Sequence, residues 1–285
     1  MGLLPGGWAT QIKFNSDLVL CTSFDFPENP VLIESSGAYG GSMNGPTEQA
    51  MGSPYLLDYG GVNGSFAYEP SQTQAINLIR WLGSRNTSYA ITADTPGGVA
   101  TYNPCFFTNI GFQVAEDTVV TANADVWAMR RPLSTDIIGS GSSIRQVALE
   151  VPTVTLIPYW TTSITPLTNA LVSWNLTASQ DLVKKFFCDA SAATDAPEPD
   201  YVLVGMLNIE LGLQMLALSS VTLSALMLDF TTATHIIKFG TTTFLTMDNM
   251  TTTGAQPNIA DMGGFYTLDT TYTVHKITLP AAPTP

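Results

Sequence analysis

The sequence predicts a mainly β protein with two β-sandwich or barrel-like domains, each carrying one α-helix. Apolar and polar side chains alternate in runs rich in Thr, Val and aromatic residues, which is the pattern of half-buried strands. Gly, Pro, Asn and Asp separate these runs, as turns require. The order strand, strand, helix, strand pair then occurs twice along the 285 residues. The predicted strands are 18–26, 63–69, 105–114, 119–127, 154–160, 171–177, 201–211, 241–247 and 264–277.

Two segments have helical spacing. In residues 71–82, Ser71 is placed to cap the helix and Gln74 to complete a capping box, while Gly83 follows where a helix ends. Apolar residues between these signals fall on one stripe. Residues 219–230 show the same i, i+3, i+4, i+7 spacing, although their β-branched content lowers the helix propensity.

The repeated order of elements predicts two domains. The segment 62–69 matches 203–210, because each run has a glycine near its start and a glutamate at its end. The stretch between the two copies holds Gly-Ser repeats typical of a flexible linker. The resulting division is a first domain at 8–132 containing a long loop at 27–61, a linker at 133–149, a second domain at 150–279 and a tail at 280–285.

Composition narrows the class of protein. Hydrophobic residues make up 45% of the chain, which excludes a disordered protein, and charged residues only 12%. So few charges suit a molecule whose faces are covered by neighbours. The 23 acidic and 10 basic residues give a net charge of −13, which disfavours tight nucleic-acid binding. The adjacent basic pairs are Arg130-Arg131 and Lys184-Lys185.

Cysteine usage and hydropathy argue against a disulfide framework and a membrane span. Cys21, Cys105 and Cys188 are an odd number, are widely spaced, and fit reduced thiols packed as small hydrophobes. A Cys21–Cys105 or intermolecular disulfide is the less favoured alternative. The apolar stretch 201–230 is interrupted by polar residues, so no membrane span is expected. No signal peptide is expected either, because the first residues lack a basic region.

Motifs for catalysis are missing from the sequence. It contains no G-x-S-x-G, P-loop or G-x-G-x-x-G pattern. His235 and His275 lie in strand-like runs without the spacing of zinc ligands. Acidic groups such as Glu116-Asp117 fit solvated turns better than a calcium or glycosidase site. We therefore expect no enzyme activity, no metal and no cofactor.

Several of these segments together resemble the tail tube proteins of tailed bacteriophages. The resemblance is carried by 62–69 leading into the helix at 71–82, by 103–114, and by a strand pair ending at Val126-Trp127-Ala128. It implies a structural protein that assembles in the host cytoplasm into stacked rings of a virion tail. Single-domain members form hexameric rings and some duplicated members form trimers. The implied partners are the chain itself, other tail proteins and, transiently, DNA passing through the lumen, with no membrane.

The resemblance also assigns residues. The loop 27–61 would reach a neighbouring subunit or the next ring, with its large side chains as buried anchors. These anchors are Tyr39, Met43, Met51, Tyr55 and Tyr59. Carboxylates lining the lumen would repel the DNA backbone. The candidates are Glu116, Asp117 and Asp248.

Two other classes remain open from the sequence. A capsid, decoration or baseplate β-sandwich would share the composition without needing a duplication or a lumen. A glycan-binding β module of a fibre would instead expose an aromatic patch and work as a monomer or trimer. An enzyme would require two carboxylates in one cleft.

Overall fold

A computed structural model of the chain shows a β protein built on one large antiparallel sheet. The structure describes residues 11–14, 17–27, 31–34, 54–58, 61–95, 98–115, 118–131, 160–162, 171–185, 199, 201–216, 235–239, 242–259 and 266–280. Strands dominate these residues, and α1 (Gln72–Arg80) is the one helix among them. The mainly β prediction is confirmed, whereas the division into two domains stays a prediction.

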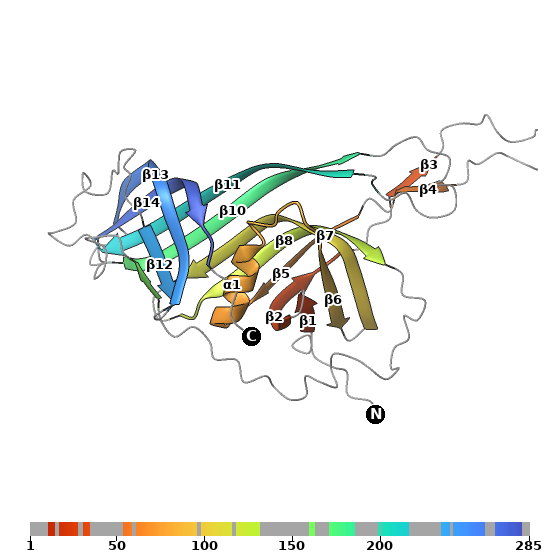
Figure 1. The fold of residues 1–285 in the computed structure, drawn as a ribbon, viewed down its shortest axis with the longest axis horizontal. Coiled ribbons are helices and arrows are strands. Elements are labelled where there is room, and N and C mark those ends of the chain that lie inside the picture. Colours follow the sequence, from red (N-terminus) through yellow and green to blue (C-terminus); the bar gives the residue numbers. More distant parts are fainter. Residues whose placement is uncertain are drawn as a thin grey trace, which may run out of the picture.

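The first half of the chain forms a closed six-stranded barrel. Its strands pair antiparallel in the order β1, β2, β5, β8, β7, β6, and β6 pairs back onto β1 to close it (Figure 1). The bounds are β1 (Gln11–Phe14), β2 (Asp17–Asp25), β5 (Val62–Tyr68), β6 (Tyr89–Thr95), β7 (Gly98–Val114) and β8 (Thr121–Arg131). A closed barrel leaves fewer free strand edges than an open sheet.

The second half continues the same sheet. Residues 109–114 of β7 pair antiparallel with residues 174–179 of β10, and the order runs on through β11, β14, β13, β12 and β9. The bounds are β9 (Trp160–Thr162), β10 (Leu171–Lys185), β11 (Tyr201–Leu216), β12 (His235–Phe239), β13 (Thr242–Ile259) and β14 (Tyr266–Thr278). Two further strands, β3 (Val31–Glu34) and β4 (Pro54–Asp58), form a separate two-stranded sheet.

The pairing order of the first half recurs in the second. β2 pairs with β5, β5 with β8 and β8 with β7, and likewise β10 pairs with β11, β11 with β14 and β14 with β13. β6 lies between β1 and β7, and β12 lies between β9 and β13. One pairing differs among the described strands: β1 joins β2 and closes the first barrel, whereas the corresponding edge of β10 is taken by β7.

A β-bulge also recurs in the two halves. In β7 the pairing with β8 shifts by one residue at Thr108, whose hydroxyl donates to the carbonyl of Asp125 at 3.1 Å. In β13 the pairing with β14 shifts at Thr253, whose hydroxyl donates to the carbonyl of Thr271, also at 3.1 Å. In each case the accepting residue pairs with the residue that follows the threonine. Bulges kink and twist a strand at a defined point.

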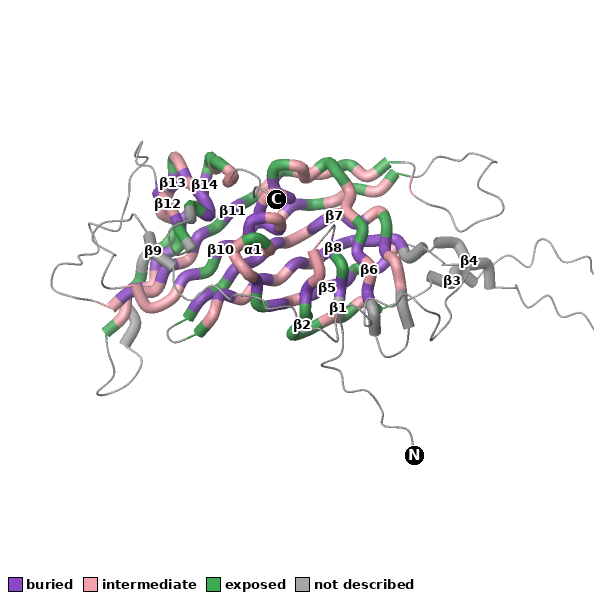
Figure 2. Tube along the Cα trace, turned by 60° about the horizontal axis from the view of Figure 1, so that its bottom comes forward, coloured by how far each residue is buried: buried purple, intermediate pink, exposed green. Residues whose placement is uncertain are grey.

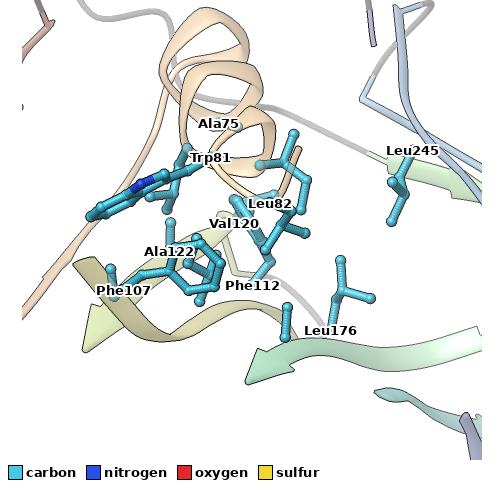
Figure 3. Packing of buried hydrophobic residues seen from close by; sticks show 14 of the residues in the cluster. Ala75, Trp81, Leu82, Phe107, Phe112, Val120, Ala122, Leu176 and Leu245 are labelled. Atoms are coloured by element: carbon cyan, nitrogen blue, oxygen red, sulfur yellow. The ribbon is translucent and has the colours of Figure 1, made fainter. Parts of the chain in front are cut away.

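Helix α1 begins and packs as its sequence predicts. The amide of Gln74 donates to the Ser71 hydroxyl at 3.3 Å, and the Gln74 side chain accepts from the Ser71 amide at 2.9 Å, forming the capping box. The apolar stripe of the helix is buried, and Trp81 and Leu82 point toward Phe107 and Phe112 on β7 (Figure 3). The helix predicted at 219–230 lies outside the described residues.

The core extends from the first barrel into the second half. Phe112 on β7 meets Phe244 on β13 edge to face, with ring centroids 4.9 Å apart. Buried residues also follow β10 and β11 where these strands lie beside β7 and β14 (Figure 2). Because the same apolar cluster includes residues of both halves, they are expected to unfold together.

Most long predicted strands are present, with different ends. β7, β10, β11 and β13 extend well beyond the predicted runs, and of the run at 154–160 the structure describes only Trp160, the first residue of β9. β1 and β6 were not predicted, and β12 was expected only as a strand-like run at His235. The loop predicted at 27–61 contains β3 and β4, and the linker at 133–149 lies outside the described residues.

The capping box offers a first test of the fold. Replacing Ser71 with Ala removes the acceptor for the Gln74 amide, and such a loss lowers the free energy of unfolding by about 1 kcal/mol. Urea denaturation followed by circular dichroism measures the change. Thr73→Ala, an exposed site inside the same helix, is the matched control and should change stability little or raise it.

Candidate assembly surface

The far ends of β10 and β11 lie above the first barrel and separate from the rest of the sheet (Figure 1). β10 stops pairing with β7 at Ser179, and β11 begins pairing with β14 only at Glu210. Within the described part of the chain, residues 180–185 therefore pair only with β11, and residues 201–209 pair only with β10. We call these two segments the distal ribbon.

Polar contacts seat the inner face of the distal ribbon on the first barrel. The Nε2 of buried Gln180 donates to the carbonyl of Phe107 on β7 at 2.8 Å. The Nζ of Lys184 lies 4.8 Å from the centre of the Trp127 ring on β8, which is a cation–π distance. Arg85, just after the helix, donates to the carbonyl of Gly205 on β11 at 3.4 Å. These contacts fix which face of the ribbon remains outside.

The outer face of the distal ribbon is apolar and exposed. Val183 pairs with Leu203, and Lys185 pairs with Tyr201, so these four side chains share one face. Their exposed fractions are 47% for Val183, 53% for Leu203 and 59% for Tyr201, and Met206 reaches 90%. Single exposed apolar residues are ordinary on protein surfaces, whereas a group of them on one face is typical of interaction surfaces.

A bulge bends the ribbon at its middle. The register between β10 and β11 shifts between Gln180 and Leu182, where Gly205 and Met206 both lie opposite Asp181. A Cβ on Gly205 would lie 3.1 Å from the backbone oxygen of Asp181, so a larger residue there would press the strands apart. The bulge thus brings Met206 to the outer face beside Leu203.

Charged and titratable side chains also lie on β12, β13 and β14. Asp248 pairs across the strands with Lys276, with Oδ2 and Nζ 3.4 Å apart. His235 is buried on β12, and burial lowers the pKa of its imidazole, while the Asp248 carboxylate acts in the opposite direction. His275 Nε2 is 2.6 Å from the Thr251 hydroxyl. Within the described ranges no group of three possible metal ligands occurs.

The buried histidine predicts a pH dependence. His235 in the unfolded chain takes up a proton below its ordinary pKa of 6.5, while the folded protein resists protonation. The unfolded state then binds more protons, so stability is lost as the pH falls below 6.5. Urea midpoints measured at about pH 7.5 and about pH 5.5 should differ less for His235→Gln than for the unchanged protein. His275→Gln, at an exposed position on β14, is the matched control for the substitution itself.

The structure places few of the sequence-predicted site residues. Asp248 lies on β13 in the ion pair with Lys276, and Tyr55 lies on β4, paired with Ile33. Glu116, Asp117, Tyr39, Met43, Met51 and Tyr59 lie outside the described residues. Sequence reasoning missed the outer face of the ribbon, although Tyr201, Val202, Leu203 and Val204 had signalled a strand with apolar residues on both faces.

The two described cysteines are free thiols. Cys21 and Cys105 form no disulfide with each other, and burial raises the pKa of each thiol to about 12. Cys105 Sγ donates to the carbonyl of Tyr102 at 3.1 Å. Thiols held in this protonated form are poor nucleophiles, which fits packing rather than chemistry.

Comparisons with known proteins do not assign the chain to a family. No protein-family model matches it, and no curated protein matches it at a significant level. The described part of the chain holds no helix long and apolar enough to cross a membrane. The features that bear on function are the repeated strand pairing, the distal ribbon and the net charge.

Proposed function

We propose that the chain is a structural subunit of a phage tail tube, which assembles into stacked rings around an acidic lumen that conducts DNA. The observation that carries this proposal is one strand order present twice, with the two halves joined edge to edge. A wall made of repeated barrels needs such a unit. A duplicated chain would supply two such units already joined.

The repeated pairing supports a duplication. Apart from the β1–β2 pairing, corresponding strands pair in the same order in both halves, and the Thr108 and Thr253 bulges make the same hydrogen bond. Two halves of unrelated origin are not expected to share a bulge at the same place, because bulges are specific features of a fold. A subunit with two copies would complete a six-unit ring as a trimer.

The junction between the halves supports assembly through strand edges. β7 uses residues 109–114 to join β10, outside the segment that pairs with β6. Within the described structure, residues 250–259 of β13 pair with β14 but with no strand on the other side. A subunit that ends in such an edge is suited to growth by addition of further subunits, except at Pro257, which has no N–H to donate.

The net charge of −13 fits a conduit for DNA, because carboxylates repel phosphates and prevent adsorption. Glu116 and Asp117 stay candidates for the lumen. Asp248 contributes less to such a field, since Lys276 offsets its charge. A net charge of this size also makes the subunits repel one another, and salt screens that repulsion.

Negative-stain electron microscopy of the purified chain tests the proposal. We expect rings or hollow tubes with threefold or pseudo-sixfold end views, and more of them at moderate than at low salt. Sheets or closed shells would instead support a capsid or decoration protein. Monomers that persist at every concentration and salt, and that bind glycans on a sugar array, would overturn the proposal in favour of a glycan-binding module.

A further inference from the structure

The bulges align the two halves of the chain residue by residue. Thr108 on β7 and Thr253 on β13 occupy the same place in their ladders. Residues 109–114 of β7, which follow the first bulge, therefore correspond to residues 254–259 of β13. The segment of β7 that joins the two halves thus has an equivalent at the far side of the sheet.

A third bulge extends the correspondence to β2 and β10. The pairing of β2 with β5 shifts at Thr22, and the pairing of β10 with β11 shifts at Val172. Because β5 and β11 occupy equivalent places in the sheet order, these two residues correspond as well. Two residues further on, Phe24 of β2 then corresponds to Trp174, where the contact of β10 with β7 begins.

The junction between the halves is made by one such pair of edges, and the equivalent pair is open. Residues 109–114 of β7 pair with residues 174–179 of β10. Among the described strands, residues 254–259 of β13 pair only with β14, and residues 21–25 of β2 pair only with β5. A strand edge of this kind presents N–H and C=O groups to which another strand can pair.

Side chains on β2 show what a strand at its open edge would cover. Trp174 and Leu176 of β10 are 2% and 1% exposed where β7 lies beside them. Their counterparts Phe24 and Phe26 are only half-buried, although their rings stack with centroids 4.6 Å apart. A strand paired with this edge would bury both rings, and removal of their surface from water favours the contact.

A second copy of the chain is the occupant that these observations select. The junction shows that an edge like that of β7 fits an edge like that of β10, and every copy offers both equivalents. Six strands lie between β2 and β13 in the sheet, and the described part of the structure does not pair the two. The complementary edge is therefore expected from another molecule.

We propose that β13 of one copy pairs antiparallel with β2 of the next copy, in the register of the β7–β10 junction. This register places Asn258 opposite Asp25, as Gln113 lies opposite Asn175. The contact is head to tail, so it generates rings or filaments and not closed dimers. It rests on the proposed self-assembly and names both edges of one interface.

Two prolines shorten the ladder without preventing it. Pro257 on β13 and Pro27 just after β2 have no N–H to donate. The register puts them in adjacent pairs, and adjacent antiparallel pairs alternate between hydrogen-bonded and non-hydrogen-bonded ones. Only one of the two prolines therefore removes a hydrogen bond from the contact. The pairs at Phe24 and Asp25 keep their donors.

Disulfide cross-linking tests the edge and the register together. Asp25→Cys and Asn258→Cys are prepared as separate proteins, mixed and oxidised in air, and non-reducing gel electrophoresis measures the covalent dimer. Directly opposite residues have Cβ atoms about 4.5–5.5 Å apart, close enough for a disulfide after a small adjustment. Both proteins carry Cys188→Ser, whereas Cys21 and Cys105 stay in place as thiols of low reactivity.

A matched mixture controls for random collisions. Gly254→Cys lies four residues from the proposed partner position, about 13 Å along the strand, which is beyond disulfide reach. We expect at least about tenfold more dimer from Asp25→Cys with Asn258→Cys than from Asp25→Cys with Gly254→Cys. Gln113→Cys/Asn175→Cys in one chain is the positive control, because these residues pair at the junction.

Two results would overturn the proposal. One is equal or absent cross-linking in the two mixtures while the positive control forms its disulfide. The other is a disulfide that forms inside the double variant Asp25→Cys/Asn258→Cys at any dilution, since the contact would then be intramolecular.

The outcomes separate this inference from the tail-tube proposal. Rings or tubes of the unchanged protein, without cross-linking of Asp25→Cys to Asn258→Cys, would leave the function standing and remove this contact. Cross-linked head-to-tail oligomers that never close into rings or tubes would support the contact and count against the tail tube.

Discussion

Replacement of Phe112 with Ala is expected to lower the free energy of unfolding by about 3–5 kcal/mol, the range for removing a buried aromatic side chain. Phe112 is 1% exposed, and its ring meets Phe244 at 4.9 Å and 71°. It lies on β7 within the segment that pairs with β10, so the substitution opens a cavity where the two halves join. Urea denaturation followed by circular dichroism measures the loss.

Two controls make this result specific. Met206→Ala removes an apolar side chain from an exposed position and should change stability by no more than about 0.5 kcal/mol. A double-mutant cycle with Phe244→Ala should give a coupling of about 0.5–1.5 kcal/mol, the range for an aromatic pair. A loss below about 1 kcal/mol for Phe112→Ala, or no coupling, would contradict a core shared by the two halves.

The sequence predicts elements whose signals are local. The helix at α1 follows from Ser71, Gln74 and the apolar stripe within one short window, and the structure confirms the capping box. Long strands such as β7 and β11 contain several alternations of apolar and polar residues, which is enough to recognise them as strands. β1 was missed because four residues contain too few alternations to distinguish a strand from a loop, and the five residues of β12 allowed no more than a strand-like run at His235.

Pairing between distant strands cannot be predicted in this way. The β7–β10 junction joins segments some 65 residues apart, and nothing in either alternation specifies the other. The sequence match of 62–69 with 203–210 illustrates the difficulty, because two alternating runs match equally well when one is shifted by two residues along the other. In the structure β5 pairs with β8 over 62–68, whereas β11 pairs with β14 over 210–216, which places the repeat further along β11.

The candidate sites show the same limit. In the sequence, Asp248 is a carboxylate near a predicted turn. The electric field around it depends on Lys276, and only the pairing of β13 with β14 places Lys276 opposite Asp248. The outer face of the ribbon depends on where β11 leaves β14, and that point has no sequence signal. The sequence analysis interpreted 201–211 as an alternating strand with one buried face, although the consecutive apolar residues 201–204 could have signalled two apolar faces.

The second large effect is expected at Gly61, directly before β5. Its φ of +71° lies in the left-handed region, where a side chain costs about 1–2 kcal/mol. A Cβ there would also overlap the buried ring of Trp127, so the indole must move, at a further cost of about 1–3 kcal/mol. Gly61→Ala should therefore lower the free energy of unfolding by about 2–5 kcal/mol in urea denaturation.

Gly254→Ala is the matched control, because nothing lies within 4 Å of a Cβ at that position. Its stability should stay within about 0.5 kcal/mol of the unchanged protein. Equal stability of the two variants would mean that Gly61 does not lie against Trp127.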